Sequence, residues 1–391
     1  MTGAGRISAR WLRAAPAQRV CAMLEEAGHN ALFVGGCVRN ALIGAPVSDL
    51  DLATDATPER VIALAQAAGL RAIPTGIDHG TVTVLAAGEP VEITTFRRDV
   101  ETDGRHATVA FSNDVAEDAA RRDFTMNALY ADARGQVHDP LGGLPDLRAR
   151  RVRFVGDPAA RVAEDYLRIL RFFRFTAWYG DPARGMDAEG LAACAAGAEG
   201  LARISAERIG AELRKLLSAP DPAPAVAAMA QAGVLRVILP GADPRALAPL
   251  VHLEAAHHLP ADPIARLAGL GGDDAAQRLR LSRAQAKRLT ALRDAATGTH
   301  GPAALGYLLG AEDAGHALTL RGALLEQPVA PFAADVARGA AAEFPITAAD
   351  LPETGRALGA RLKTLRVAWL RADLHPNRAA LLALPPEGDA D

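Results

Sequence analysis

Hydrophobic and polar residues follow two different periods along the chain, and the change falls near residue 150. Before it, short runs with strand character are interspersed with helical segments. The predicted strands are Asn30–Val34, Ser48–Leu52, Gly80–Leu85 and Pro90–Thr95. The predicted helices are Arg13–Ala27, Val38–Leu42 and Pro58–Gly69, and Val100–Val109 is predicted to be a mobile loop. Because the strands are short and partly joined as a hairpin, we expect a small mixed sheet and not a doubly wound parallel one.

Beyond residue 150 the apolar residues recur at helical spacing, and strand-like alternation largely disappears. Ser205 is placed to cap a helix over Ser205–Leu217. The other predicted helices are Ala159–Tyr179, Ala225–Ala232, Ala275–Leu292, Ala303–Gly310, Ala314–Leu325 and Thr354–Leu370. Pro220–Pro224 is typical of a linker. The pattern predicts an α+β protein with a head over 1–150, a helical neck over 151–220 and a helical body and tail over 221–391.

Composition narrows the class of protein. Of 391 residues, 50% are apolar and 23% are charged, which is enough apolar surface for packed cores. No apolar run approaches the ~20 residues of a membrane helix, and no secretory segment follows the arginines near the N-terminus. The three cysteines show no CxxC spacing, which argues against a disulfide framework and a structural zinc site. We therefore expect a cytoplasmic protein that is not bound to a membrane.

The charge of the chain gives weaker information. The formal net charge is −3, so any nucleic-acid binding has to rest on local basic surface. The basic residues are almost all arginine, with lysine only at Lys215, Lys287 and Lys363. GC-rich coding produces such a bias, and an arginine therefore has to be judged by its position.

A glycine pair between a predicted strand and a predicted helix is the first candidate for chemistry. Gly35 and Gly36 allow close approach of the backbone to a ligand, and the N–H groups at a helix start suit a phosphate. Arg39 lies one turn further on and is able to clamp phosphate oxygens. Gly-Gly turns without a ligand are also common, so this motif alone leaves both interpretations open.

Paired carboxylates form the second candidate. On a strand, Asp49 and Asp51 share one face while Leu50 and Leu52 point to the other. Two carboxylates so close repel unless a cation joins them, and oxygen ligands suit Mg²⁺. Glu92, on a later strand, is a candidate third carboxylate. The alternative is a solvated polar strand face.

Two further segments combine arginines with acidic residues. Arg122, Asp123 and Asn127 lie close together before an apolar run, a density that suits triphosphate and ribose contacts. Asp165 and Arg168 are expected at positions i and i+3 of one helix face. Their alternatives are a charged helix cap and a surface ion pair worth a few tenths of a kcal/mol.

Six motifs occur in a family-like order and carry a resemblance. They are GGCVRN, SDLDLAT, VEITTFR, RRDFTMNA, HDPLGGLPDL and EDYLRILRFFRF. Together they resemble the class II CCA-adding tRNA nucleotidyltransferases and the related bacterial poly(A) polymerases. The match is dense from Ala31 to Phe175 and weaker beyond. One departure is Asn40, where the family usually has Asp.

The resemblance implies a polymerase-β-like head and a role for each motif. Asp49 and Asp51 would bind two Mg²⁺ ions, with Glu92 beside them as a catalytic carboxylate. Of the nucleotide-binding residues, the resemblance implies Gly36, Arg39, Arg122, Asp165, Arg168 and Arg171, and the residue patterns above add Gly35, Asp123 and Asn127. Cytosine and adenine both present an amino donor beside a ring-nitrogen acceptor, which a carboxylate and a guanidinium match. Asp165 and Arg168 would thus select C and A over G and U.

The resulting functional hypothesis is template-independent addition of C, C and A to the 3′ end of the tRNA acceptor arm from CTP and ATP. The alternative within the family is a poly(A) polymerase, although the acidic end of the sequence, LLALPPEGDAD, favours CCA addition. A nucleic-acid-binding protein with an inactive head is disfavoured by the intact carboxylate motifs. A metal phosphohydrolase around His257 and His258 lacks matching partner histidines. The sequence predicts no oligomeric state.

Overall fold

The computed structural model describes residues 5–103 and 106–385, and the side chains of 99–109 are not among those described. The last six residues of the acidic end, 386–391, therefore lie outside the described residues. The chain forms two compact units, Met1–Ile204 and Ser205–Asp391. The finer division at residues 150 and 220 stays a prediction.

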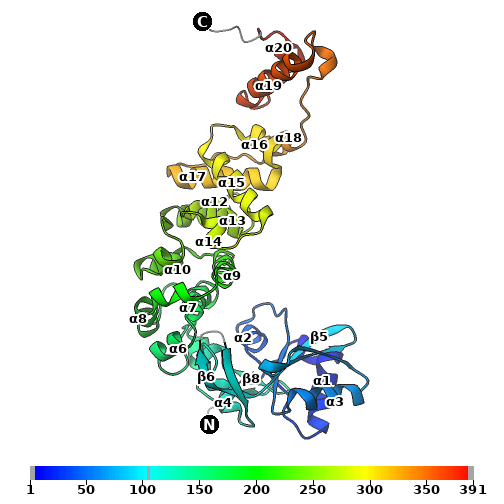
Figure 1. The fold of residues 1–391 in the computed structure, drawn as a ribbon, viewed down its shortest axis with the longest axis vertical. Coiled ribbons are helices and arrows are strands. Elements are labelled where there is room, and N and C mark those ends of the chain that lie inside the picture. The colour runs from blue at the N-terminus through cyan, green and yellow to red at the C-terminus, as the bar shows by residue number, and fades with distance from the viewer. Residues whose placement is uncertain (1–4, 104–105, 386–391) are drawn as a thin grey trace. The chain divides into compact units, whose positions relative to one another are not determined.

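A mixed sheet of seven strands forms the centre of the first unit (Figure 1). Its order is β3-β4-β5-β2-β1-β8-β9, in which β2 and β5 run parallel and the other neighbours are antiparallel. The strands are β1 Leu32–Val34, β2 Asp51–Thr54, β3 Arg71–Gly76, β4 Thr81–Ala86, β5 Glu89–Thr95, β8 Tyr130–Ala131 and β9 Val137–His138. The predicted mixed sheet is confirmed, but β2 begins at Asp51 and not at Ser48.

Two hairpins extend this unit. Ala87 and Gly88 join β4 to β5 with φ values of 51° and 85°, the left-handed pair that a tight two-residue hairpin turn requires. The predicted loop over Val100–Val109 is wrong, because β6 Arg97–Asp103 and β7 His106–Phe111 pair with each other as a second, two-stranded sheet. Residues 104–105, within that prediction, lie outside the described residues. The polar composition hid the β-branched and aromatic positions of β7.

Eight α-helices of the described residues belong to the first unit. They are α1 Ala15–Glu26, α2 Gly36–Ile43, α3 Pro58–Ala67, α4 Val115–Ala120, α5 Leu144–Arg148, α6 Pro158–Glu164, α7 Leu167–Tyr179 and α8 Ala188–Ala196. The single helix predicted over Ala159–Tyr179 is therefore wrong. Asp165 has an extended backbone, with φ −151° and ψ 104°, and its Oδ1 accepts the N–H of Leu167 at 3.1 Å. An aspartate that bonds a nearby backbone N–H in this way competes with helix continuation.

A cluster of phenylalanines packs α7 against the segment that precedes it. The rings of Phe154 and Phe172 stack with centroids 5.5 Å apart, and Phe124 lies 4.9 Å from Phe175. Phe124, Phe154 and Phe172 are all fully buried. Such aromatic pairs contribute packing beyond their buried area, so they hold α7 firmly beside the third sequence motif.

The second unit of the described chain consists of helices. They are α9 Ala206–Leu217, α10 Ala223–Gln231, α11 Val234–Ile238, α12 Leu247–Ala256, α13 Pro263–Leu270, α14 Ala275–Arg278, α15 Arg283–Thr297, α16 Pro302–Leu309, α17 Ala311–Leu325, α18 Ala333–Ala340, α19 Gly355–Arg371 and α20 Arg378–Leu382. The predicted cap is confirmed, since Ser205 Oγ accepts the N–H of Arg208. The helix predicted over Ala275–Leu292 is two helices, because Ser282 and Gln285 form a capping box that starts α15 anew. Among the described helices, none is long and apolar enough to cross a membrane.

Candidate active site

The sheet brings the three predicted carboxylates together. Asp51 is the first residue of β2 and lies in register with Glu92 of the parallel strand β5. Side chains in register on neighbouring strands point to the same face. Asp49 precedes β2, in contrast to the prediction that it lies on the strand, yet it lines one cavity of about 590 Å³ with Asp51 and Glu92. Trp11 and Thr83 contribute to the same wall.

Electrostatic repulsion acts among these carboxylates. Partial burial and the charges of Glu92 and Asp49 raise the pKa of Asp51 to about 6, against the pull of Arg122. A carboxyl group held among other carboxylates is stabilised in its charged form by a cation. The donor set, which is all oxygen, fits a hard divalent metal such as Mg²⁺.

The glycine pair lies at the start of α2, beside these carboxylates. Gly35 has φ 70°, a left-handed conformation that strains other residues, and a Cβ placed on it would lie 3.6 Å from Arg122 Nη1. The backbone N–H of Arg39 donates the first hydrogen bond of the helix, to the Gly35 carbonyl at 2.9 Å. The N–H groups of the helical residues before Arg39 therefore have no acceptor within the helix. Cys37 Sγ lies 3.9 Å from the Asp51 carbonyl, which ties this helix start to β2.

Arg39 is a buried cation held on every side. Its Nη1 donates to Asn127 Oδ1 at 2.5 Å, and its Nη2 donates to the Tyr179 hydroxyl at 2.8 Å. Its guanidinium also lies 4.0 Å from the centre of the Tyr179 ring. The structure thus joins the first motif to the third and, through Tyr179, to the end of α7. Tyr179 was not predicted, and only its position at the end of the fourth motif's helix distinguishes it in the sequence.

The family-atypical residue beside it has a clear structural role. Asn40 Oδ1 accepts from Arg39 Nε at 3.0 Å, while Asn40 Nδ2 donates to the Pro46 carbonyl at 2.7 Å. An ionised aspartate accepts hydrogen bonds but donates none. The amide therefore keeps the loop before β2 bonded to α2 in a way that the usual aspartate does not.

Asp123 connects the third motif to α7. Its Oδ1 accepts from Asn127 Nδ2 at 2.9 Å, and its Oδ2 accepts from Arg171 Nε at 2.8 Å. Burial opposes ionisation of Asp123, but the Arg171 charge and these hydrogen bonds outweigh it and lower the pKa. Four predicted residues, Arg39, Asn127, Asp123 and Arg171, form one continuous network.

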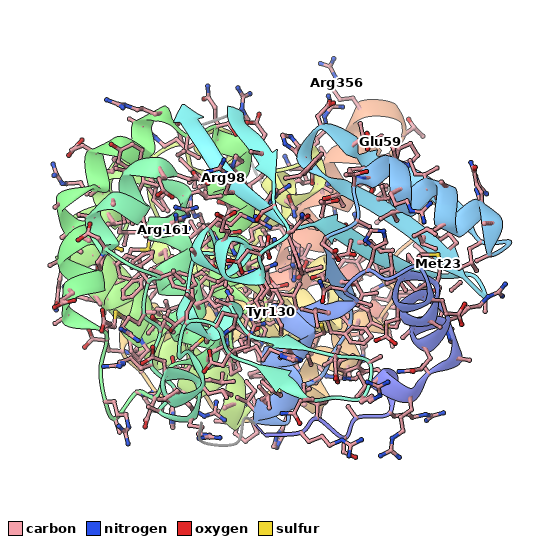
Figure 2. All side chains as sticks on the ribbon, turned by 90° about the horizontal axis from the view of Figure 1, so that it is seen from below. Met23, Glu59, Arg98, Tyr130, Arg161 and Arg356 are labelled. Atoms are coloured by element: carbon pink, nitrogen blue, oxygen red, sulfur yellow. The ribbon has the colours of Figure 1, made fainter. Side chains whose placement is uncertain are left out.

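Arg122 is held by two residues that sequence reasoning missed. It donates to Asp118 Oδ2 at 2.8 Å and to the hydroxyl of Tyr130 at 3.0 Å, and Tyr130, labelled in Figure 2, is fully buried. The Tyr130 hydroxyl in turn donates to Asp118 at 2.7 Å. The spacing of Asp118 and Arg122, four residues apart, was the available signal.

The fourth motif is arranged differently from the prediction. Because α6 ends before Asp165, the expected i, i+3 pair on one helix face is wrong. Arg168 instead donates to the carboxylate of Glu164 and to the Arg161 carbonyl, the latter at 2.8 Å. The Asp165 carbonyl accepts the Arg168 N–H at 2.9 Å. Glu164, four residues before Arg168, was missed although its spacing indicates the contact.

Similarity to known proteins agrees with this arrangement. Residues 31–153 match the family described as poly A polymerase head domain, and residues 186–245 match the one described as "Probable RNA and SrmB- binding site of polymerase A". The chain is 47% identical over 190 residues to the human mitochondrial CCA tRNA nucleotidyltransferase 1, covering 48% of this chain and 44% of the human protein. The CCA-adding enzyme of Geobacillus stearothermophilus is 41% identical over 220 residues, or 56% of this chain and 52% of that protein. The chain thus spans about half the length of these curated relatives in the matched regions.

Solved structures extend the likeness further along the chain. The Thermotoga maritima CCA-adding enzyme complexed with tRNA has a TM-score of 0.68 over 98% of both chains, at 19% identity, which shows a shared fold. The Bacillus stearothermophilus CCA-adding enzyme in complex with CTP has a TM-score of 0.73 and 30% identity, covering 92% of this chain and 93% of that one. The chain belongs to the class II family of CCA-adding enzymes and related poly(A) polymerases.

Proposed function

We propose that the protein adds C, C and A to the 3′ end of tRNA from CTP and ATP, without a nucleic-acid template. The observation that carries the proposal is the register of Asp51 with Glu92, which gathers a carboxylate cluster beside a phosphate-type helix start. Relatives named as CCA-adding enzymes support the choice of reaction.

Asp49 and Asp51 would hold two Mg²⁺ ions. Repulsion among the carboxylates and an all-oxygen donor set support this assignment. When bound, such ions supply activation of the RNA 3′-hydroxyl and charge stabilisation at the triphosphate and the departing pyrophosphate. Glu92 lies on the same face and helps to set the negative potential of the cavity.

The residues around the start of α2 would bind the triphosphate. Gly35 and Gly36 let backbone N–H groups approach the phosphate oxygens, and Arg122 lies against this turn. Arg39 is held by Asn127 and Tyr179, so its charge is fixed before the nucleotide binds. Preorganised charge of this kind stabilises a developing negative charge without reorganisation at the moment of reaction.

Asp165 and Arg168 would select the base. The carboxylate accepts from the amino group of C or A, and the guanidinium donates to the adjacent ring nitrogen. Glu164 and the Arg161 carbonyl support this proposal because they hold the Arg168 side chain in a fixed direction. Uracil and guanine present the opposite pattern and would leave both groups unpaired.

The decisive experiment incubates the full-length protein with Mg²⁺ and tRNA that lacks its 3′ CCA. CTP and ATP are supplied separately and together, and products are resolved at single-nucleotide length. We expect two additions with CTP alone and three with both. Long adenosine tails with ATP alone would instead identify a poly(A) polymerase, and no extension under any condition would contradict both activities.

A further inference from the structure

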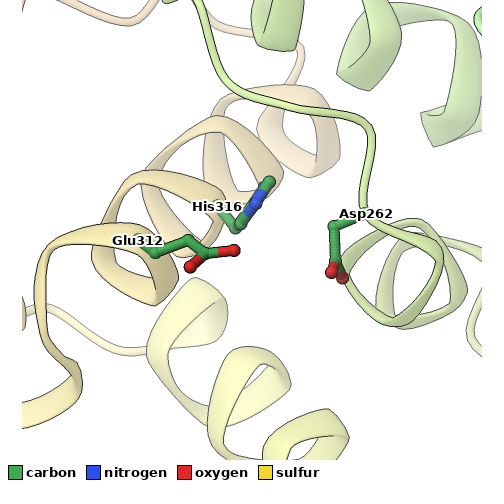
Figure 3. Close-up of side chains that lie close together, drawn as sticks. All are labelled: Asp262, Glu312 and His316. Atoms are coloured by element: carbon green, nitrogen blue, oxygen red, sulfur yellow. The ribbon is translucent and has the colours of Figure 1, made fainter.

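A second group of metal-type ligands lies in the helical unit. It consists of Asp262, Glu312 and His316, whose ligand atoms all lie within 4.8 Å of one another (Figure 3). Glu312 and His316 are four residues apart on α17 and therefore share one face of that helix. Asp262 caps the start of α13. None of the three belongs to the proposed nucleotidyl-transfer site.

Of these three residues, His316 gives the evidence for a bound ligand. Its side chain is fully buried, and neither Nδ1 nor Nε2 has a hydrogen-bond partner. A buried polar group without a partner destabilises the fold. The neutral imidazole is the form of histidine that ligates metals. A metal bond would give one of the two ring nitrogens the partner that it lacks.

The net charge of the groups around His316 favours binding of a divalent cation. Asp262, Glu312 and Asp313 carry negative charge, and Arg288 faces them from α15. Arg288 donates to Asp262 Oδ2 and to Asp313 Oδ1, each at 2.7 Å. Three carboxylates and one guanidinium leave two negative charges for a bound ion to neutralise.

Asp262 is already oriented as a ligand. Its Oδ1 accepts two backbone N–H groups of the first turn of α13 at 2.9 and 2.7 Å, and Arg288 fixes the other oxygen. Outer hydrogen bonds of this kind fix the direction of a ligating carboxylate. Ligand atoms around a tetrahedral zinc ion lie about 3.3 Å apart, given bonds of about 2.0 Å. The ligand atoms here lie within 4.8 Å of one another, so they must move closer to bind zinc. Glu312 is the exposed residue of the three, and its side chain has the freedom to make that movement.

We propose that Asp262, Glu312 and His316 bind one Zn²⁺ ion that joins α13 to α17 and stabilises the helical unit. One imidazole nitrogen with two carboxylates is a donor set that zinc accepts, whereas Mg²⁺ and Ca²⁺ prefer oxygen alone. The cysteine spacing speaks only against a zinc site with thiolate ligands, and this site uses none.

The test uses the full-length protein with Asp49→Asn and Asp51→Asn in the background, so that the carboxylates of the head do not bind the added metal. The protein is stripped with a chelator, and ZnCl₂ alone is added. We expect one equivalent of tightly bound zinc and a higher melting temperature. Glu312→Gln, at an exposed position, should weaken zinc binding about tenfold or more and abolish the thermal shift.

A histidine comparison shows which ligands are used. His316→Gln should lose the same equivalent, and His258→Gln, at an exposed histidine of the same unit, should keep it. Co²⁺ in place of zinc should give the visible absorbance of a low-symmetry site, which Glu312→Gln removes. The proposal is overturned if the background protein retains no zinc at micromolar concentration, or if Glu312→Gln binds zinc as tightly as its parent.

Discussion

Asp51 is a partly buried carboxyl group that lies among other carboxylates. Its pKa is raised to about 6, so between its usual value and that point the folded state holds a proton that the unfolded chain has released. The contribution of Asp51 to folding stability is therefore lost as pH rises through about 6. At neutral pH without metal, the ionised group opposes folding.

Asp51→Asn should consequently separate folding from catalysis. We expect nucleotide addition to be abolished, while the metal-free protein melts higher than wild type at pH 7.5, by about 2–4 °C for each kcal/mol of relieved repulsion. The difference should disappear below about pH 4. Addition rates and melting curves across pH measure both. Near-normal catalysis by the variant would refute the assignment of Asp51 as a metal ligand.

Asp118 should show the opposite pH dependence. Burial alone would raise its pKa, but Arg122, Arg121 and the Tyr130 hydroxyl lower it to about 2. A lowered carboxyl pKa contributes stability that is present above the unfolded value and lost as pH falls toward 2. Asp118→Asn should cost on the order of 2 kcal/mol at pH 7, with the gap to wild type closing between about pH 4 and pH 2.

Chemical denaturation at several pH values would test this expectation. Glu59→Gln is a suitable control, because Glu59 is an exposed residue in the first turn of α3. If Asp118→Asn remained equally destabilised at pH 2 and pH 7, the effect would come from packing and not from ionisation.

At the scale of elements, the sequence predicted helices and strands well where one local pattern dominates. Pro58–Gly69 and the hairpin of β4 and β5 are such cases, and they form close to their predicted bounds. Prediction from the sequence failed where a single side chain competes with the local pattern. Asp165 ends α6 by bonding the backbone ahead of it, and Ser282 starts α15 as a new helix.

The candidate site shows the same division. Motif order predicted the residues around Arg39 and Asp123, because each is a charged residue in a short, recognisable segment. It did not predict which of them touch, since Tyr179 is 140 residues from Arg39 along the chain. Long-range contacts depend on how α7 packs through its phenylalanines, and no local period encodes that packing.

The α6–α7 junction is the element that should control base choice. Asp165→Ala removes the acceptor for the base amino group, and Arg168→Ala removes the donor to the ring nitrogen. Both variants should lose the ability to use CTP and ATP. Their discrimination against UTP and GTP should also decrease, by on the order of 1–3 kcal/mol for each lost contact, as in base recognition by other proteins. Single-nucleotide incorporation with each of the four triphosphates measures this.

Glu164→Gln separates positioning from recognition at the same junction. It keeps a side chain of similar size but weakens the hold on Arg168. We expect a smaller loss of discrimination than in Arg168→Ala. Should Asp165→Ala and Arg168→Ala both keep wild-type ratios of C and A over U and G, base choice lies elsewhere in the protein.

At the scale of the whole molecule, the net charge of the protein does not favour binding of the proposed substrate. The net charge is −3, whereas tRNA is a polyanion that presents its backbone and shape. Binding therefore has to depend on local basic surface, and residues 186–245, which match an RNA-binding family description, are the first place to expect it. Each phosphate neutralised by arginine or lysine releases counterions from the RNA.

Affinity for tRNA should consequently fall steeply with added salt despite the negative net charge. Contacts to as few as about three phosphates lower affinity roughly tenfold or more between about 50 and 200 mM monovalent salt. The measurement is binding of tRNA lacking CCA, with Mg²⁺ held constant, at four or more salt concentrations. A parallel series with CTP alone is the control, because a shallower slope there separates contacts to the RNA backbone from contacts to the triphosphate. A tRNA affinity that stays flat across the series would mean that shape and stacking, and not phosphate contacts, hold the substrate.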